Sequence, residues 1–295
     1  MDRLIGILLI VIAAASFATS PIFARISYDA GANPNTFLFI RFAIAATVIT
    51  LIMVFKGLRW PRGRLLVSLV LIGGVCFAGL NLSFYTALTL APVNLVIVIA
   101  YMYPALVTLL SALFLNQPIT KQQYAALFLT LVGVVVTTGL DWGGQSLGIV
   151  LAITTAVIYS AYFTFGSLSI RKAGPIPASA VIFISVTIVY GVLVTIQGFK
   201  SPTALSGWAA IILCALFSTV FGIVCLYEGL KRVDLANTAI VSTFEVVVAA
   251  ILAILILGET MSMSKIIGAC MIISAVTVLG RGEYKSARVR NGKLS

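Results

Sequence analysis

The chain has 295 residues, of which 61% are hydrophobic and 9% charged, with 19 Lys and Arg against 8 Asp and Glu and no histidine. A soluble domain has roughly a quarter of its residues charged, so this composition excludes a soluble fold and predicts that most of the surface faces lipid. The lack of histidine excludes imidazole metal ligands and Ser-His or Cys-His nucleophiles, and no metal or other cofactor is predicted.

Apolar segments follow one another along the chain, each near the roughly 20 residues that a helix needs to cross a bilayer. Short charged or Pro/Gly-bearing turns separate them. The ten predicted spans are 4–24, 36–55, 65–89, 93–115, 122–140, 146–166, 178–197, 207–229, 236–257 and 265–281. The predicted fold is an all-α integral membrane protein with the lipid bilayer as a partner. No soluble stretch is long enough to form a nucleic-acid-binding face, so no nucleic-acid partner is predicted.

The basic residues predict the orientation of the spans. With ten spans, 15 of the 19 Lys and Arg residues fall on one side of the membrane. Arg25, Lys200 and Lys265 fall on the other, and Arg41 falls inside a span. Because cytoplasmic loops retain positive charge, both termini are predicted to be cytoplasmic, in an inner or plasma membrane.

An internal repeat relates the two halves of the sequence. Residues 6–25 align without gaps with residues 148–167, an offset of 142, and the same offset relates Tyr85 to Tyr227. Five spans per copy is an odd number, so the second copy is expected to lie inverted in the membrane. Repeats of this kind build alternating-access carriers with a site near the midplane. The predicted units are a five-helix repeat at 1–141, an inverted repeat at 142–281 and a basic cytoplasmic tail at 282–295.

Residues 257–262 (LGETMS), followed by 265–269 (KIIGA), are similar to the signature that ends each repeat in the ten-helix EamA-type branch of the drug/metabolite transporter superfamily. The first copy departs from it, with Asn116-Gln117-Pro118 in place of Gly-Glu and Ala126 in place of the glycine. The resemblance covers nearly the whole chain. It implies secondary transport of small metabolites, commonly export, without ATP hydrolysis, and thus no enzyme.

A shorter motif narrows the implied substrate. The fourth span contains the segment Tyr101-Met102-Tyr103-Pro104, which resembles the corresponding segment in exporters of aromatic and other bulky hydrophobic amino acids. In those exporters tryptophan is usual where Tyr103 stands. The resemblance implies amino acids or similar amphipathic metabolites as small-molecule substrates.

Charged residues at membrane depth are functional candidates because each is costly there. Glu245 is the deepest, about ten residues from either end of the ninth span, and the offset of 142 makes Tyr103 its counterpart. Glu245 is expected either to receive a substrate ammonium or to exchange a proton. The structural alternative is a protonated carboxyl group that bonds between helices. Whether transport is coupled to protons stays open.

Two further charges are weighed as coupling or gating residues. Arg41 lies about six residues inside the second span, and the favoured interpretation is that its side chain snorkels to the interface. The alternative is that its guanidinium holds a carboxylate. Glu228 stands beside Lys231 and Arg232, which favours a surface ion pair or a gate element over a midplane ligand.

Polar and aromatic residues inside the spans complete the predicted substrate site. Deep tyrosines need partners for their hydroxyl groups, so they indicate a partly polar cavity wall. Tyr85 and Tyr227 stand near span ends, where interfacial anchoring is favoured. Pro104 and Pro21 are expected to break their helices. The predicted substrate-binding residues are Asn81, Tyr85, Tyr101, Tyr103, Pro104, Tyr159, Tyr162 and Glu245.

Other functions are weighed against a carrier. An intramembrane protease would need a catalytic set that the sequence lacks. A multidrug exporter of organic cations stays open because of Glu245, although the first span has no deep acidic residue. A channel-like uniporter is the further alternative, although no filter segment is evident.

Overall fold

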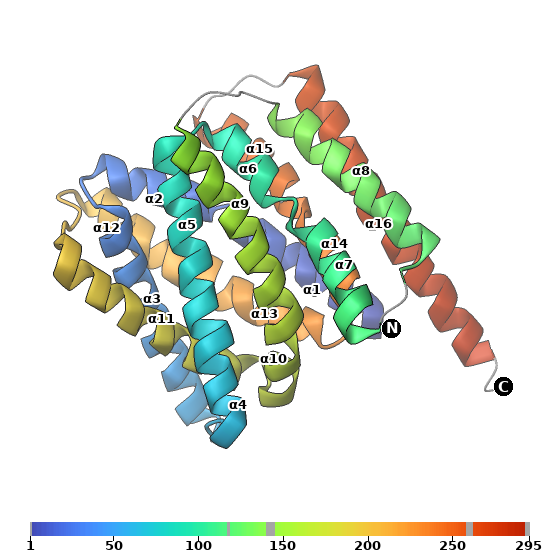
Figure 1. Cartoon of the computed structure of the whole chain (residues 1–295), viewed down its shortest axis with the longest axis horizontal. Coiled ribbons are helices and arrows are strands. Elements are labelled where there is room, and N and C mark those ends of the chain that lie inside the picture. Colours follow the sequence, from blue (N-terminus) through green and yellow to red (C-terminus); the bar gives the residue numbers. More distant parts are fainter. Residues whose placement is uncertain (1, 117–118, 140–144, 258–261, 293–295) are drawn as a thin grey trace.

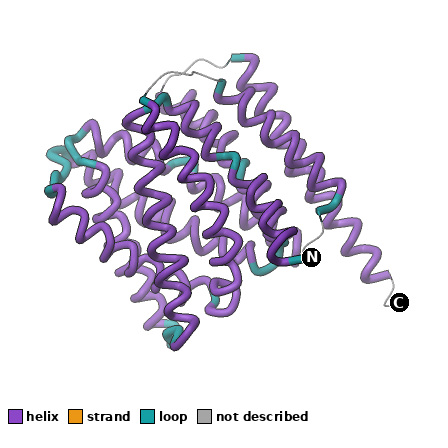
Figure 2. Tube along the Cα trace, viewed as in Figure 1, coloured by secondary structure: helices purple, strands orange, loops and turns teal. Residues whose placement is uncertain are grey.

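The computed structural model describes the whole chain except residues 1, 117–118, 140–144, 258–261 and 293–295. The described residues form helices and connecting loops without a strand, as Figure 2 shows. In the first half the helices are α1 (Asp2–Phe17), α2 (Ser20–Asp29), α3 (Pro34–Phe55), α4 (Gly63–Ser68), the π-helix η1 (Leu69–Cys76), α5 (Phe77–Leu90), α6 (Val93–Ala100), α7 (Tyr103–Leu115) and α8 (Lys121–Thr138).

The helices of the second half follow in the chain. Its helices are α9 (Ser146–Ala161), the π-helix η2 (Tyr162–Gly166), α10 (Ser167–Ala173), α11 (Pro175–Gln197), α12 (Leu205–Leu213), the π-helix η3 (Cys214–Phe221), α13 (Gly222–Leu230), α14 (Leu235–Ser242), α15 (Phe244–Leu257) and α16 (Met263–Gly292). Helix α16 continues through most of the segment predicted as a tail. The predicted boundary at 141 and part of the 257–262 motif lie outside the described residues.

Eight helical stretches of the described chain are long and apolar enough to cross a membrane. The fifth and tenth predicted spans correspond to two shorter apolar helices, at Lys121–Thr137 and Met263–Leu279. Large apolar side chains such as Leu8, Phe55, Leu113, Ile188 and Ile196 are exposed on the outside of the bundle. An apolar exterior of this extent is expected where lipid replaces water.

Helix interruptions recur in the two halves. The first predicted span breaks between α1 and α2, and the sixth passes into η2 at the corresponding place. The third and eighth contain η1 and η3, and the fourth and ninth break around Met102 and Thr243. Pro21 and Pro104 each lie in the first turn after a break, where a missing N–H costs nothing;. The interruptions therefore lie close to the offset of 142 found in the sequence.

The strongest packing joins helices from different halves. Helix α3 packs on α11 and α8 packs on α16, while α1 packs on α13 and α5 packs on α9. The last two contacts correspond to each other under the offset of 142. In Figure 1 α8 and α16 run side by side at one edge of the bundle. The residues from both halves therefore meet around a shared interior.

Candidate functional site

A cavity of about 120 Å³ lies between helices of both halves. One water needs about 10–15 Å³ of such space, so several waters or part of a small molecule can enter. Six of the eight predicted substrate-binding residues line it, together with Arg41 and ten other residues. The six are Asn81, Tyr85, Tyr101, Tyr103, Tyr159 and Glu245, and the ten are Phe17, Ser20, Pro21, Phe77, Leu80, Phe84, Ala100, Thr155, Ser218 and Ile223.

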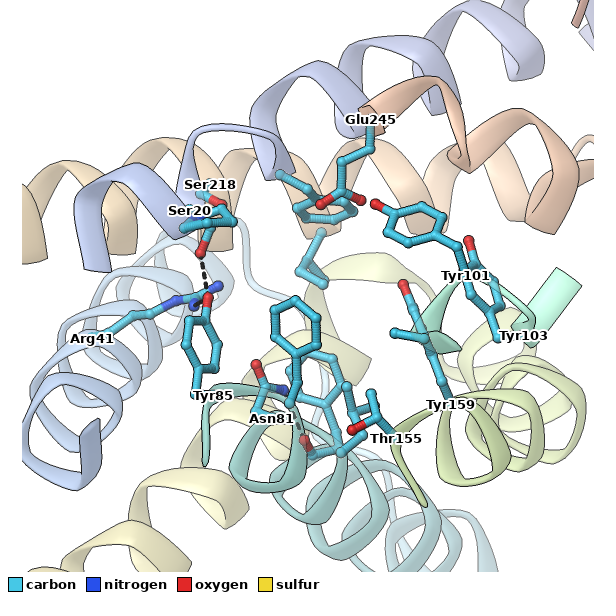
Figure 3. A pocket seen from close by; sticks show the side chains of 17 residues that line it. Ser20, Arg41, Asn81, Tyr85, Tyr101, Tyr103, Thr155, Tyr159, Ser218 and Glu245 are labelled. Carbon is cyan, nitrogen blue, oxygen red and sulfur yellow. Dashed lines mark hydrogen bonds between the residues drawn. The ribbon is translucent and has the colours of Figure 1, made fainter. Parts of the chain in front are cut away.

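One wall of the cavity combines a carboxyl group with tyrosines. Glu245 lies in the first turn of α15, directly after the break at Thr243, where the amide dipoles favour a carboxylate;. Figure 3 shows the Tyr101 hydroxyl pointing toward the Glu245 carboxyl group. The ring of Tyr103 stacks on that of Tyr159 with centroids 4.2 Å apart. The break between α6 and α7 places Tyr101 and Tyr103 at this wall.

The other wall holds Arg41, and the snorkelling interpretation is wrong. Its side chain on α3 is 6% exposed and lines the cavity. Nε donates to Thr219 Oγ1 at 2.6 Å, and Nη1 donates to the Tyr85 hydroxyl at 3.0 Å. The guanidinium turns inward, where these two hydroxyl groups from neighbouring helices each accept one of its hydrogen bonds.

Tyr85 continues this network, so the expectation of an interfacial anchor is wrong for it as well. Its hydroxyl accepts from Arg41 and bonds to Ser20 Oγ at 2.7 Å. Tyr227 is equally buried, and its hydroxyl bonds to that of Tyr162. Both bonds join residues 65 positions apart, and the offset of 142 relates Ser20 to Tyr162 and Tyr85 to Tyr227. The two halves thus carry equivalent hydroxyl bonds between corresponding helices.

Two predicted substrate-binding residues lie outside the cavity lining. Tyr162 is buried, with its hydroxyl bonded to Tyr227. Pro104 follows Tyr103 in α7 and is also buried, but one residue turns a helix by about 100°. Its ring therefore faces a different direction from the cavity-lining Tyr103.

The remaining predicted residues have local partners. Glu228, near the end of α13, pairs with Lys231 at 3.3 Å and with Arg232 at 2.7 Å, and its side chain is 32% exposed. This is the surface ion pair that was weighed, and Glu228 does not line the cavity. Asn81 does line it, and its Nδ2 donates to the carbonyl of Phe77 one turn earlier.

The residues that sequence reasoning missed include hydroxyl groups within apolar spans. Ser218 lies in η3, is fully buried, and its Oγ has no hydrogen-bond partner among the described residues. Thr219, the next residue, bonds both to Arg41 and to the carbonyl of Cys214 five residues earlier. A π-helix turns side chains away from the ordinary α-helical register and is often found at functional sites. The only signal in the sequence was a Ser-Thr pair inside a span.

Comparison with models of protein families shows the family to which the chain belongs. The model of the EamA-like transporter family matches it twice, at residues 4–139 and at residues 146–281. The chain belongs to this family. It is therefore a multi-pass membrane protein of a transporter family, which implies a small-molecule substrate and a bilayer rather than an enzyme's reaction.

Individual relatives agree with this assignment. The uncharacterized transporter YyaM of Bacillus subtilis is 26% identical over 279 residues, which cover 88% of this chain and 89% of the relative. An uncharacterized transporter of Archaeoglobus fulgidus is 26% identical over 253 residues, which cover 84% and 89%. A crystal structure with 21% identity aligns with a TM-score of 0.80, over 93% of this chain and 96% of the other. That structure shows a shared fold.

Proposed function

We propose that this EamA-family protein is a secondary-active transporter that works by alternating access, with ten spans in two inverted repeats at 1–141 and 142–281. The double match of the family model supports this arrangement. The recurrence of helix breaks close to the same offset and the equivalent bonds at Tyr85 and Tyr227 support it further. Both termini are cytoplasmic in this proposal, and the direction of transport is export from the cell.

The observation that carries the proposal is the carboxyl group of Glu245 in a cavity with aromatic walls. A carboxylate attracts an ammonium group, and tyrosine rings offer an apolar surface with an electron-rich face. The proposed substrates are hydrophobic or aromatic amino acids, whose ammonium group meets Glu245 while their side chain lies against Tyr103 and Tyr159. Glu245 also serves as the group that exchanges a proton where transport is coupled to a pH gradient.

The same wall supports a second candidate function, the export of organic cations. A cation without a carboxylate would use Glu245 and the faces of the tyrosines equally well. The two candidates differ in what they require of Arg41, on the opposite wall, because an organic cation is repelled by it.

The test is uptake of labelled phenylalanine and leucine into proteoliposomes, with and without a pH gradient. Saturable uptake is expected from the unaltered protein. Glu245→Gln is expected to lower it at least about tenfold, since the buried charge partner of the substrate is lost, and to remove any response to pH. The matched control is Asp29→Asn, which changes an exposed pair with Arg25 outside the cavity lining and should alter uptake less than about twofold;.

Three results would contradict the proposal. Unchanged uptake in Glu245→Gln would leave only a structural role for this carboxyl group. Flux of organic cations without flux of amino acids would favour the second candidate. Currents at channel-like rates would indicate a uniporter of the channel type instead.

A further inference from the structure

Arg41 is a buried cation without an anion beside it. Its two hydrogen-bond acceptors, Thr219 Oγ1 and the Tyr85 hydroxyl, are neutral. No described carboxylate forms an ion pair with it. A guanidinium withdrawn from water is stable only when an anion or further acceptors complete its bonding. The cavity, which Arg41 lines, is where such an anion can enter.

The donors around Arg41 suit a carboxylate. The printed hydrogen bonds of Arg41 to described residues use Nε and Nη1, which leaves Nη2 for a further acceptor. Ser218 lines the same cavity, and its buried hydroxyl group has no partner among the described residues. Figure 3 shows Ser218 and Ser20 beside the Arg41–Tyr85 pair. A guanidinium and a hydroxyl group together can donate to both oxygens of a carboxylate. The Arg41 hydrogen bonds to Thr219 and Tyr85 hold the guanidinium in place for this contact.

Glu245 is the one described carboxylate that lines the cavity with Arg41. They form no salt bridge, since Arg41 is held by Thr219 and Tyr85 while Glu245 faces Tyr101. The cavity therefore has a positive and a negative group held apart on different walls. A ligand that bears both charges satisfies both groups at once.

We propose that Arg41 and Ser218 form a carboxylate subsite, which makes the transporter selective for zwitterionic amino acids over amines and organic cations. This inference rests on the proposed function and adds which substrates the transporter selects. In it, Arg41 binds the substrate carboxylate directly, Ser218 donates a hydrogen bond to it, and Glu245 receives the ammonium. The Tyr85 hydroxyl acts as a positioning group for Arg41.

The experiment compares three ligands with one phenyl ring: L-phenylalanine with both charges, phenethylamine without the carboxylate, and 3-phenylpropionate without the ammonium. Binding to the purified full chain is measured by calorimetry, and inhibition of labelled phenylalanine uptake is measured in proteoliposomes. The unaltered protein should bind phenylalanine at least about tenfold more tightly than either analogue, because each analogue leaves one buried group unpaired. This part needs no variant and thus no assumption about folding.

Variants then assign each charge to its group. Arg41→Gln should weaken binding of phenylalanine and phenylpropionate at least about tenfold and leave phenethylamine within about twofold, since only the first two use a carboxylate. Ser218→Ala should have a smaller effect on the same two ligands. Glu245→Gln should show the opposite pattern, weakening phenylalanine and phenethylamine. Arg25→Gln is the matched control, because Arg25 is exposed, pairs with Asp29 and lies outside the cavity lining.

Two outcomes overturn the carboxylate subsite while transport persists. One is equal binding of phenylalanine and phenethylamine by the unaltered protein. The other is an equal loss of all three ligands in Arg41→Gln, when its elution profile and melting temperature match those of Arg25→Gln. Failure of the proposed function would give a different result. If the unaltered protein transported no amino acid at all, both the proposed function and the carboxylate subsite would be overturned.

Discussion

At the scale of single residues, the hydroxyl group of Tyr85 both positions the Arg41 guanidinium and joins two helices of the cavity wall. It accepts from Arg41 and bonds to Ser20, so it links α3 to α2 while holding the guanidinium. Tyr190 offers a comparison, because its hydroxyl donates to the carbonyl of Ala78 at 2.8 Å, is equally buried and does not line the cavity. Tyr85 and Tyr190 are therefore both buried and hydrogen-bonded, but only Tyr85 holds a charged group of the cavity in place.

We expect Tyr85→Phe to lower the free energy of unfolding by about 1–3 kcal/mol, because it leaves a buried donor of Arg41 without its acceptor. It should also weaken binding of carboxylate-bearing ligands. Tyr190→Phe should cost a comparable amount of stability and leave ligand binding unchanged. Thermal unfolding in detergent and calorimetric titration measure the two effects. Equal loss of ligand binding in both variants would contradict a specific role for Tyr85.

Arg41 also shows where prediction from sequence stops at this scale. Its depth of six residues inside a span is compatible with either snorkelling or burial, since an arginine stem reaches across that distance. The choice depends on which face of α3 meets Thr219 and Tyr85, which come from other helices. By contrast, Glu245 and Tyr101 were recognised as candidates because their depth alone makes a polar group costly.

At the scale of elements, equivalent bonds hold corresponding helices in each half. The Tyr162–Tyr227 bond joins η2 to α13, and the Ser20–Tyr85 bond joins α2 to α5. We expect Tyr162→Phe and Tyr227→Phe each to lower the free energy of unfolding by about 1–3 kcal/mol, because each leaves the other phenol unsatisfied. The double variant should cost less than the sum of the two, with a coupling of about 0.5–3 kcal/mol. Additive costs in thermal unfolding would mean that the bond contributes nothing.

Close helix packing makes a second prediction at this scale. A Cβ added at Gly268 on α16 would overlap Thr137 Oγ1 and would lie 2.6 Å from the carbonyl oxygen of Gly133 on α8. Gly268→Ala is therefore expected to lower stability by about 1–3 kcal/mol, since the helices must separate. Gly79→Ala is the control, because its Cβ would only touch Ile158 at 3.6 Å. It should leave the melting temperature in detergent unchanged or raise it, and equal loss in both variants would contradict the packing argument.

At the scale of the whole molecule, the proposed orientation in the membrane predicts on which side of the bilayer each loop lies. Lys56 follows α3 on the side of the membrane that is predicted to hold most of the Lys and Arg residues. Lys200 lies in the loop before α12, on the other predicted side. In a variant without the four native cysteines, Lys56→Cys is expected to be protected from an impermeant maleimide in intact cells, whereas Lys200→Cys should react. Both should react after lysis. Reaction of Lys56→Cys in intact cells, with protection of Lys200→Cys, would contradict the proposed orientation.

The sequence by itself determined that the chain is helical and apolar enough to cross a membrane, the order of its apolar segments, the internal sequence repeat and the position of Glu245 within one of these segments, because these depend on residue type and position along the chain. Tertiary structure decided the rotation of each helix, and with it the inward turn of Arg41, the burial of Tyr85 and Tyr227, and the place of Ser218 in the cavity. The physical reason is that these helices meet lipid on one side and protein on the other. Both environments are apolar, so no helical periodicity of polar residues marks the inner face.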